Sequence, residues 1–121
     1  ITSKVTSNPK KQNAMNRKNF KTPYYAVLFS YQRGTDLEGY LDTDEKTLEL
    51  AKSMPGYLGH EFAGDGNVHA IFISYWKDME SIENWNRNST HKEAKAKGKS
   101  QWYQWYHSQI SKVEHSAYNE L

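Results

Sequence analysis

Histidine is the residue type in this sequence best suited to proton transfer near neutral pH, and His91 is the best placed of the five histidines. An imidazole titrates close to neutrality, so it can accept a proton from a bound molecule. Helical spacing puts His91 on the same side as Ala94 and Gly98, which is expected to be the inner side. We therefore identify His91 as the candidate catalytic base, with a hydrogen-bonded histidine or a helix-start residue as the alternative.

Large aromatic residues are the second chemical feature, because all four tryptophans lie between His69 and Tyr106. Oxygenation without a cofactor needs a base and a water-poor aromatic pocket in which an electron-rich anion can meet dioxygen. The expected pocket residues are Trp76, Ile82, Trp85, Trp102 and Tyr103. The sequence thus predicts a pocket and a base, and ordinary core packing is the alternative for the same residues.

His60 and His69 flank a predicted hairpin turn, Asp65-Gly66. This turn would pair Phe62 with His69 and His60 with Ile71, which puts both histidines on one sheet face, roughly 7–8 Å apart at their backbones. Two imidazoles and a third ligand could hold a metal. No carboxylate is expected on that face and the chain has no cysteine, so no metal site is predicted. Both are interpreted as hydrogen-bonded histidines at a subunit interface.

These side chains need elements to position them, and the first is a strand over residues 24–31, YYAVLFSY. Both alternating sets of positions are apolar, which predicts a central strand covered on both faces. The pattern Asp42-x-x-Glu45 then predicts a capping box that opens a helix over residues 43–54. Pro55-Gly56 ends that helix. Its apolar stripe consists of Leu48, Ala51 and Met54.

The second half of the chain predicts two strands, a broken helix and a fourth strand. Asp78 is suited to cap a helix, and residues 86–89 interrupt it. Ser89 or Thr90 starts a further helical segment whose lysines face water. The inner face of the first segment carries Met79, Ile82 and Trp85. The strand after Gly98 carries four aromatic residues in alternation, so half should line the cavity and half a subunit interface: Trp102, Tyr103, Trp105 and Tyr106.

The order strand, helix, strand, strand, helix, strand predicts an α+β fold of the ferredoxin-like βαββαβ type with a four-stranded antiparallel sheet. The helices can cover only one face of that sheet. The other face carries large apolar residues that a monomer rarely exposes. We therefore expect a homodimer in which two sheets pack face to face as an α/β barrel.

The chain has 121 residues and a net charge of +2, which fits one domain. Residues 1–21 carry six Lys or Arg and no acidic residue, and are expected to form a flexible basic arm ahead of a domain over residues 22–121. The arm lacks the interleaved aromatic residues and arginines that proteins use to bind single-stranded nucleic acid. No apolar segment is long enough for a membrane span or a signal peptide. We expect a cytoplasmic protein that binds neither nucleic acid nor membranes.

Several motifs together resemble the antibiotic biosynthesis monooxygenase family, over about residues 22–115. They are Tyr24-Tyr25-Ala26-Val27, Met54-Pro55-Gly56-Tyr57-Leu58-Gly59, Ser74-Tyr75-Trp76-Lys77 before Trp85, and His91 with Gly98 and Trp102-Tyr103. His91, Gly98 and Trp102-Tyr103 match a branch of small, mostly uncharacterised bacterial members. The resemblance implies a dimeric α/β barrel with a pocket between helices and sheet in each subunit.

The resemblance implies two chemistries, cofactor-free oxidation of polycyclic phenols and degradation of bound heme. Trp85 occupies the position of a pocket tryptophan in both groups. Heme-degrading members place an axial histidine where Lys95 stands and an asparagine on the first strand, which has none here. Phenol-oxidising members have a tyrosine where His91 stands. The leading hypothesis is a monooxygenase-like protein that uses dioxygen without a cofactor.

The substrate of that hypothesis is a small aromatic or polyketide-like molecule. Two alternatives remain open. One is a non-catalytic dimeric barrel that binds a hydrophobic ligand, and the other is a heme-binding or heme-degrading protein with altered ligation.

Overall fold

The computed structural model of this chain describes residues 20–65 and 69–121, and the predicted basic arm lies outside them except for its last two residues. The elements are β1 (Tyr24–Arg33), α2 (Tyr40–Ser53), β2 (Tyr57–Gly64), β3 (His69–Trp76), α3 (Met79–Arg87), α4 (Ser89–Lys97), a π-helical turn (Gly98–Trp102) and β4 (Tyr103–Val113). The antiparallel strands lie in the order β2-β3-β1-β4. This order confirms the predicted ferredoxin-like α+β fold.

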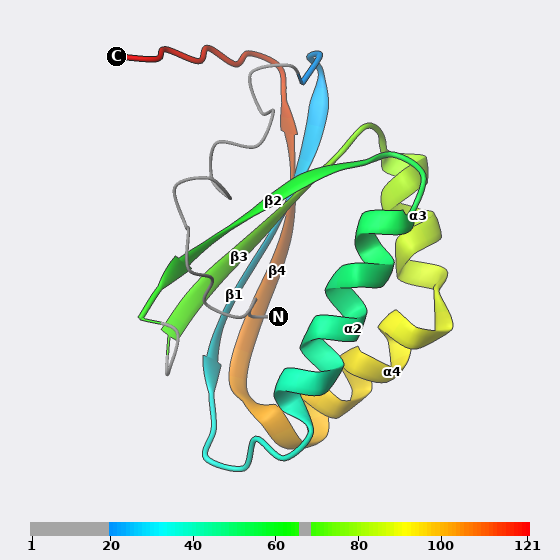
Figure 1. Cartoon of the computed structure of the whole chain (residues 1–121), viewed down its shortest axis with the longest axis vertical. Helices are drawn as coiled ribbons and strands as arrows, with labels where there is room; N and C mark the ends of the chain where they lie inside the picture. Colours follow the sequence, from blue (N-terminus) through cyan, green and yellow to red (C-terminus); the bar gives the residue numbers. More distant parts are fainter. Residues whose placement is uncertain (1–19, 66–68) are drawn as a thin grey trace.

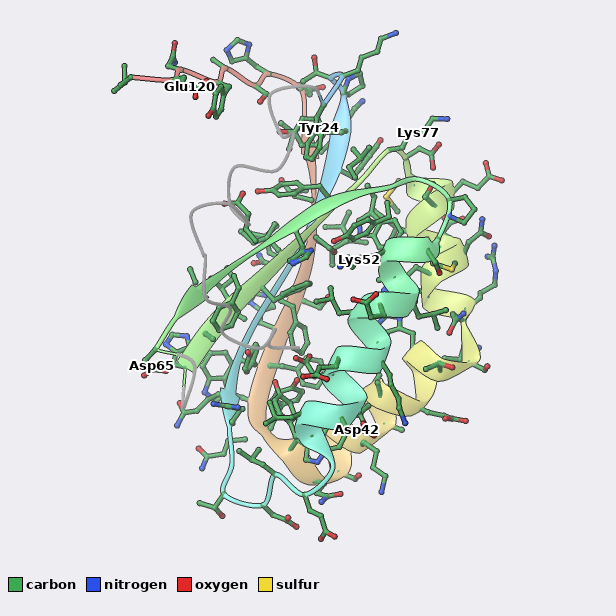
Figure 2. All side chains as sticks on the ribbon, in the orientation of Figure 1. Tyr24, Asp42, Lys52, Asp65, Lys77 and Glu120 are labelled. Atoms are coloured by element: carbon green, nitrogen blue, oxygen red, sulfur yellow. The ribbon has the colours of Figure 1, made fainter. Side chains whose placement is uncertain are left out.

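The helices form one layer on one face of the sheet, and no helix covers the other face within the described residues (Figure 1). Figure 2 shows the side chains of both layers meeting between them. The core there is built on the fully buried Trp76 and on Ile82, Trp85 and Ala51. Burying one such large apolar side chain contributes roughly 1.5–3 kcal/mol. None of the described helices is long and apolar enough to cross a membrane.

β1 is the central strand and has side chains on both faces, as its apolar sequence predicts. Its pairing sets Val27 opposite Ser74, and both line the helix-covered side. Leu28 pairs with Ile73 and points to the other face. Phe20, just before the strand, packs on Tyr24 with ring centroids 5.3 Å apart. Phe20 therefore packs against the first residue of β1.

The start of α2 differs from the prediction. The helix begins at Tyr40 rather than at residue 43, and its N-cap is Gly39, which has φ 78° and no side-chain cap bond. Asp42 therefore lies inside the first turn, so the predicted capping box with Glu45 is wrong. Glycine reaches this left-handed conformation without the strain of a side chain, so the loop can enter the helix three residues early.

The register of the hairpin between β2 and β3 also differs from the prediction. Phe62 pairs with Phe72 rather than with His69, and His60 pairs with Ser74 rather than with Ile71. A shift by an odd number of residues reverses the face of one strand relative to the other. His60 consequently faces the helices and is buried, whereas His69 is exposed on the other face. The expectation that they share a face is wrong.

The broken helix follows the prediction. The Asp78 carboxylate accepts hydrogen bonds from the backbone N–H and the hydroxyl of Ser81, at 2.8 and 2.6 Å, and caps α3. The helix ends at Arg87, and the side chain of Asn88 accepts the backbone N–H of His91 at 3.2 Å, which caps α4. These two caps orient α3 and α4 separately against the sheet.

β4 departs from simple alternation at its start. Trp102 belongs to the π-helical turn, and a bulge pairs Gln32 with Trp105 but Arg33 with Tyr103. An extra residue in one strand interrupts the alternation of side chains between the two faces of the sheet. Tyr103 and Tyr106 therefore lie on the same, helix-covered side with Trp102. The expected equal division of the four aromatic residues is wrong, because three of them line one cavity.

Candidate functional site

A cavity of about 150 Å³ lies between the sheet and the helices. Aromatic and aliphatic side chains form most of its wall, and a few polar groups interrupt them. Its aromatic wall includes Phe29, Tyr40, Tyr57, Phe72, Trp76, Trp85, Trp102, Tyr103 and Tyr106. An apolar cavity of about this volume accepts a benzene molecule, whereas drug-sized ligands occupy roughly 300 Å³ or more.

The six residues proposed from the sequence as base and pocket are brought together around this cavity: Trp76, Ile82, Trp85, His91, Trp102 and Tyr103. They come from β3, α3, α4, the π-helical turn and the start of β4. Their proximity is a result of the fold, because His91 and Trp76 lie on different elements. Their roles in binding or catalysis stay predictions.

His91 is held by two contacts. Its ring stacks on Trp85 with centroids 4.3 Å apart and an angle of 13° between planes. Its Nδ1 lies 3.2 Å from the backbone carbonyl oxygen of Trp85. A carbonyl can only accept, so Nδ1 carries the proton and the neutral ring presents a lone pair at Nε2. The histidine is thus set as a proton acceptor.

Burial determines the charge of His91. The side chain is 8% exposed. Loss of water lowers its pKa to about 4, partly offset by the hydrogen bond to Trp85 and assisted by the positive charge of Lys95. The imidazole is therefore neutral at pH 7. Neutrality frees Nε2 to accept a proton, while the low pKa makes the nitrogen a weak base.

The inner face of α2 contributes polar groups that the sequence reasoning missed. Tyr40, Asp44 and Thr47 are buried and line the cavity beside Ala51. Asp44 is 4% exposed, an uncommon state for a carboxylate. The signal was available, since these residues follow the helical spacing of Ala51. A search for apolar residues alone passes over such a stripe.

Tyrosine hydroxyls gather at the same end of the cavity. Tyr103 donates a hydrogen bond to the hydroxyl of Tyr40 at 3.3 Å. Burial raises the pKa of Tyr103 well above its usual value, and the charge of Asp44 adds to the effect. Tyr31 is fully buried and has a raised pKa for the same main reason. These phenols stay protonated at neutral pH and offer hydrogen bonds rather than charge.

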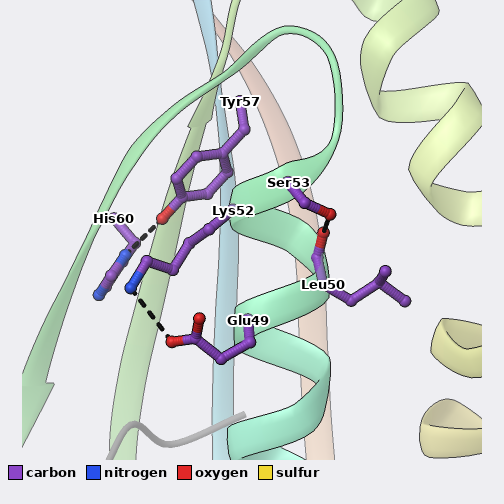
Figure 3. A network of polar contacts seen from close by, with 6 residues as sticks. All are labelled: Glu49, Leu50, Lys52, Ser53, Tyr57 and His60. Carbon is purple, nitrogen blue, oxygen red and sulfur yellow. Dashed lines mark hydrogen bonds and ion pairs between the residues drawn. The ribbon is translucent and has the colours of Figure 1, made fainter.

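A second polar pair missed by the sequence reasoning lies toward β2. Tyr57 lines the cavity, and its hydroxyl is hydrogen-bonded to Nδ1 of His60 (Figure 3). Within residues 20–65 and 69–121 there is no group of three or more histidine or acidic side chains arranged to hold a metal ion. The cavity therefore combines an aromatic wall with tyrosine, histidine and aspartate groups at separate points.

The sequence of this chain matches a known protein family and a bacterial relative. Residues 25–97 match the family model described as antibiotic biosynthesis monooxygenase. The chain is also 39% identical to the uncharacterised protein YqjZ of Bacillus subtilis strain 168. The 92 aligned residues cover 76% of this chain and 81% of that protein. Identity at this level over most of both chains indicates common descent.

Solved structures share the fold at low sequence identity. SnoaB of Streptomyces nogalater, described as a cofactor-independent oxygenase, superposes with a TM-score of 0.60 at 11% identity, covering 83% of this chain and 98% of that one. Rv0793 of Mycobacterium tuberculosis gives a TM-score of 0.66 at 9% identity, covering 78% and 99%. At such identity these structures support the fold alone.

Proposed function

We propose a function for this chain from its membership of the antibiotic biosynthesis monooxygenase family, to which it belongs. It is a monooxygenase-like protein that oxidises a small aromatic molecule with dioxygen and without a cofactor. One observation carries the proposal. A neutral histidine, His91, lies in the wall of an otherwise mostly aromatic cavity with its Nε2 lone pair available. The pocket residues proposed around it are Trp76, Ile82, Trp85, Trp102 and Tyr103.

The chemistry needs few groups from the protein. Nε2 of His91 takes a proton from a phenol hydroxyl, or from the activated methylene carbon of an anthrone. The anion that remains is electron-rich at a ring carbon that still carries hydrogen. That anion passes an electron to dioxygen, and the two radicals combine into a peroxide. Loss of water then leaves a new carbonyl, with one oxygen atom in the product and the other in water. The mostly aromatic wall of the cavity limits the access of competing water.

The size of the cavity narrows the substrate. At about 150 Å³ it suits a single aromatic ring with small substituents. A three-ring polyketide would require the helices or side chains to move outward. We therefore place a monocyclic, electron-rich aromatic compound ahead of a polyketide-like one.

Oxygen uptake tests the proposal. We expect the protein to accelerate oxygen consumption by one member of a panel of electron-rich phenols with hydrogen on the para carbon and a hydroxyanthrone, relative to protein-free buffer. His91→Ala should lower the rate about 100-fold, because a positioned base contributes roughly 10²–10⁴-fold. His115→Ala is the matched control, since His115 lies after the end of β4 and is exposed.

Two results of the uptake experiment would contradict the proposal. An unchanged rate in His91→Ala would remove this residue as the base. No uptake with any compound of the panel would remove the oxygenase function itself.

A non-catalytic binding protein is the second candidate, and one observation favours it. A pKa of about 4 leaves His91 a poor acceptor for protons from weak acids such as phenols. A family member that only holds a small aromatic ligand would keep the same cavity. Ligand binding without oxygen uptake would identify this case.

Heme does not fit the described cavity. A porphyrin consists of four pyrrole rings around a metal and is several times larger than the single ring that this volume holds. At the position where heme-degrading relatives are expected to have their axial histidine, this chain has Lys95, an exposed residue at the edge of the cavity that offers no imidazole.

We also propose that the protein forms a homodimer through the sheet face that no described helix covers. Leu28 and Ile73 pair there at the centre, and Trp105, 43% exposed, lies on the same face. A contiguous apolar face of this kind is usually covered by a partner. A cytoplasmic location is proposed on the absence of cysteine, which is common in reducing compartments.

A further inference from the structure

Tyr57 and His60 form a side-chain pair on β2 that the proposed reaction does not use. Tyr57 lines the cavity and packs edge-on against Trp76, with ring centroids 5.4 Å apart. His60 is 4% exposed and stacks on Phe72, with centroids 5.5 Å apart and an angle of 21° between planes. Both rings are thus held by aromatic neighbours that also line the cavity.

The hydrogen bond between them has a definite direction. Burial lowers the pKa of His60, and the positive charge of Lys52 lowers it further against the smaller opposing effect of Glu61. Burial also raises the pKa of Tyr57, with a contribution from Glu49. Both side chains are therefore uncharged at pH 7. A phenol hydroxyl is a stronger donor than an imidazole N–H, and an unprotonated imidazole nitrogen is a stronger acceptor than a phenol oxygen. We therefore assign the tyrosine hydroxyl as the donor and Nδ1 of His60, in the tautomer protonated at Nε2, as the acceptor (Figure 3).

This direction leaves Tyr57 with one chemical role toward the cavity. A hydroxyl has one proton and two lone pairs, and the proton is committed to His60. The neighbouring indole N–H of Trp76 donates to the hydroxyl oxygen of Ser74 at 2.9 Å, so it is directed away from Tyr57. The oxygen of Tyr57 can therefore accept a hydrogen bond from a ligand but not donate one.

We propose that the oxygen of Tyr57, oriented by His60, accepts a hydrogen bond from a neutral hydroxyl or N–H group of the ligand, and so decides which end of the ligand lies beside β2. Tyr57 is then a specificity residue and His60 a positioning residue. The inference rests on the proposed function, because it assumes that a small aromatic molecule enters the cavity.

Anaerobic binding measurements test this role separately from oxidation. Binding of 4-methylphenol and 4-methylanisole is followed by amide NMR shifts under nitrogen; the two compounds differ by one methyl group on the oxygen. We expect the phenol to bind about tenfold more tightly, because the ether leaves a buried acceptor unpaired. Tyr57→Phe should reduce the preference to about twofold or less.

Variants of His60 distinguish orientation from packing. His60→Phe keeps a stacked ring but lets the Tyr57 hydroxyl turn and donate, so the preference for the phenol should fall below about threefold as the ether gains affinity. His60→Asn places an acceptor oxygen near the position of Nδ1 and should restore most of the preference for the phenol over the ether. Tyr75→Phe is the matched control on the other sheet face, where the hydroxyl bonds Glu61, and should keep the tenfold preference.

A wild-type preference retained in Tyr57→Phe, or no preference in the wild type, would overturn the inference. If a His60 variant fails to fold, Tyr57→Phe alone still decides. The result is separable from the proposed function. A Tyr57-dependent preference without any oxygen uptake would sustain this inference and remove the oxygenase function. Oxygen uptake that depends on His91, without a preference that depends on Tyr57, would support the oxygenase function and overturn this inference.

Discussion

His91 shows how burial and one hydrogen bond decide the chemistry of a single side chain. The bond from Nδ1 to the carbonyl of Trp85 selects the tautomer, and burial keeps the ring neutral. A sequence can indicate that a histidine faces inward. It cannot say how far burial lowers the pKa, because the surrounding groups come from other elements.

The low pKa of His91 predicts a stability that depends on pH. The pKa is about 4 in the folded protein against 6.5 ordinarily, so between these values the unfolded chain binds more protons. The free energy of unfolding therefore falls as the pH decreases, by about 2 kcal/mol between pH 7 and pH 5 from this residue. Urea denaturation at several pH values measures it.

His91→Phe keeps a ring beside Trp85 but cannot titrate, and it should remove about 2 kcal/mol of this pH dependence. Part of the dependence remains, because the pKa of His60 is also lowered. His115→Phe serves as the control at an exposed position after the end of β4. Equal pH dependence in His91→Phe and the wild type would contradict the buried neutral histidine.

At the scale of elements, the π-helical turn before β4 shapes the cavity. Its last bond joins the backbone N–H of Tyr103 to the carbonyl of Gly98, and Gly34 donates to the carbonyl of Trp102 at 2.8 Å. Trp102 in turn donates its indole N–H to the carbonyl of Glu38 at 3.0 Å. The turn thereby fixes two aromatic cavity residues against the loop that precedes α2.

Gly98 permits this arrangement, since a Cβ there would lie 2.7 Å from the Tyr103 ring. Alanine normally favours a helix by about 1 kcal/mol over glycine. Here we expect Gly98→Ala to lower the free energy of unfolding by about 1–3 kcal/mol, because the ring is packed against other tyrosines. Urea denaturation measures the change.

A Tyr103→Leu background provides the control for Gly98→Ala. Without the ring the same substitution should become neutral or stabilising. If Gly98→Ala stabilises the wild type, the close approach of Gly98 to Tyr103 is wrong.

At the scale of the whole molecule, the two sheet faces have different functions. One closes the cavity together with the helices, and the other carries Leu28 and Ile73 at its centre. Because β1 is apolar on both alternating sets of positions, neither face is suited to water. The proposed dimer buries the second face while leaving each cavity within its own subunit.

Sedimentation velocity tests the dimer at micromolar concentration. We expect the wild type to sediment as a dimer and Ile73→Lys as a monomer, because two-fold symmetry would bury like charges near each other. Leu41→Lys is the control, since Leu41 is 55% exposed on α2 rather than on the sheet. A monomeric wild type would contradict the proposed dimer.

The sequence by itself determined the order of helices and strands, the helix cap at Asp78 and the position of the helix break. It also indicated which aromatic residues line the cavity. These features depend on local spacing and capping, which a short segment specifies. Only the tertiary structure decided the β2–β3 register, the bulge beside Arg33 and the burial of His60. Those depend on contacts between distant segments, where a shift of one residue reverses a face, so no local pattern could have resolved them.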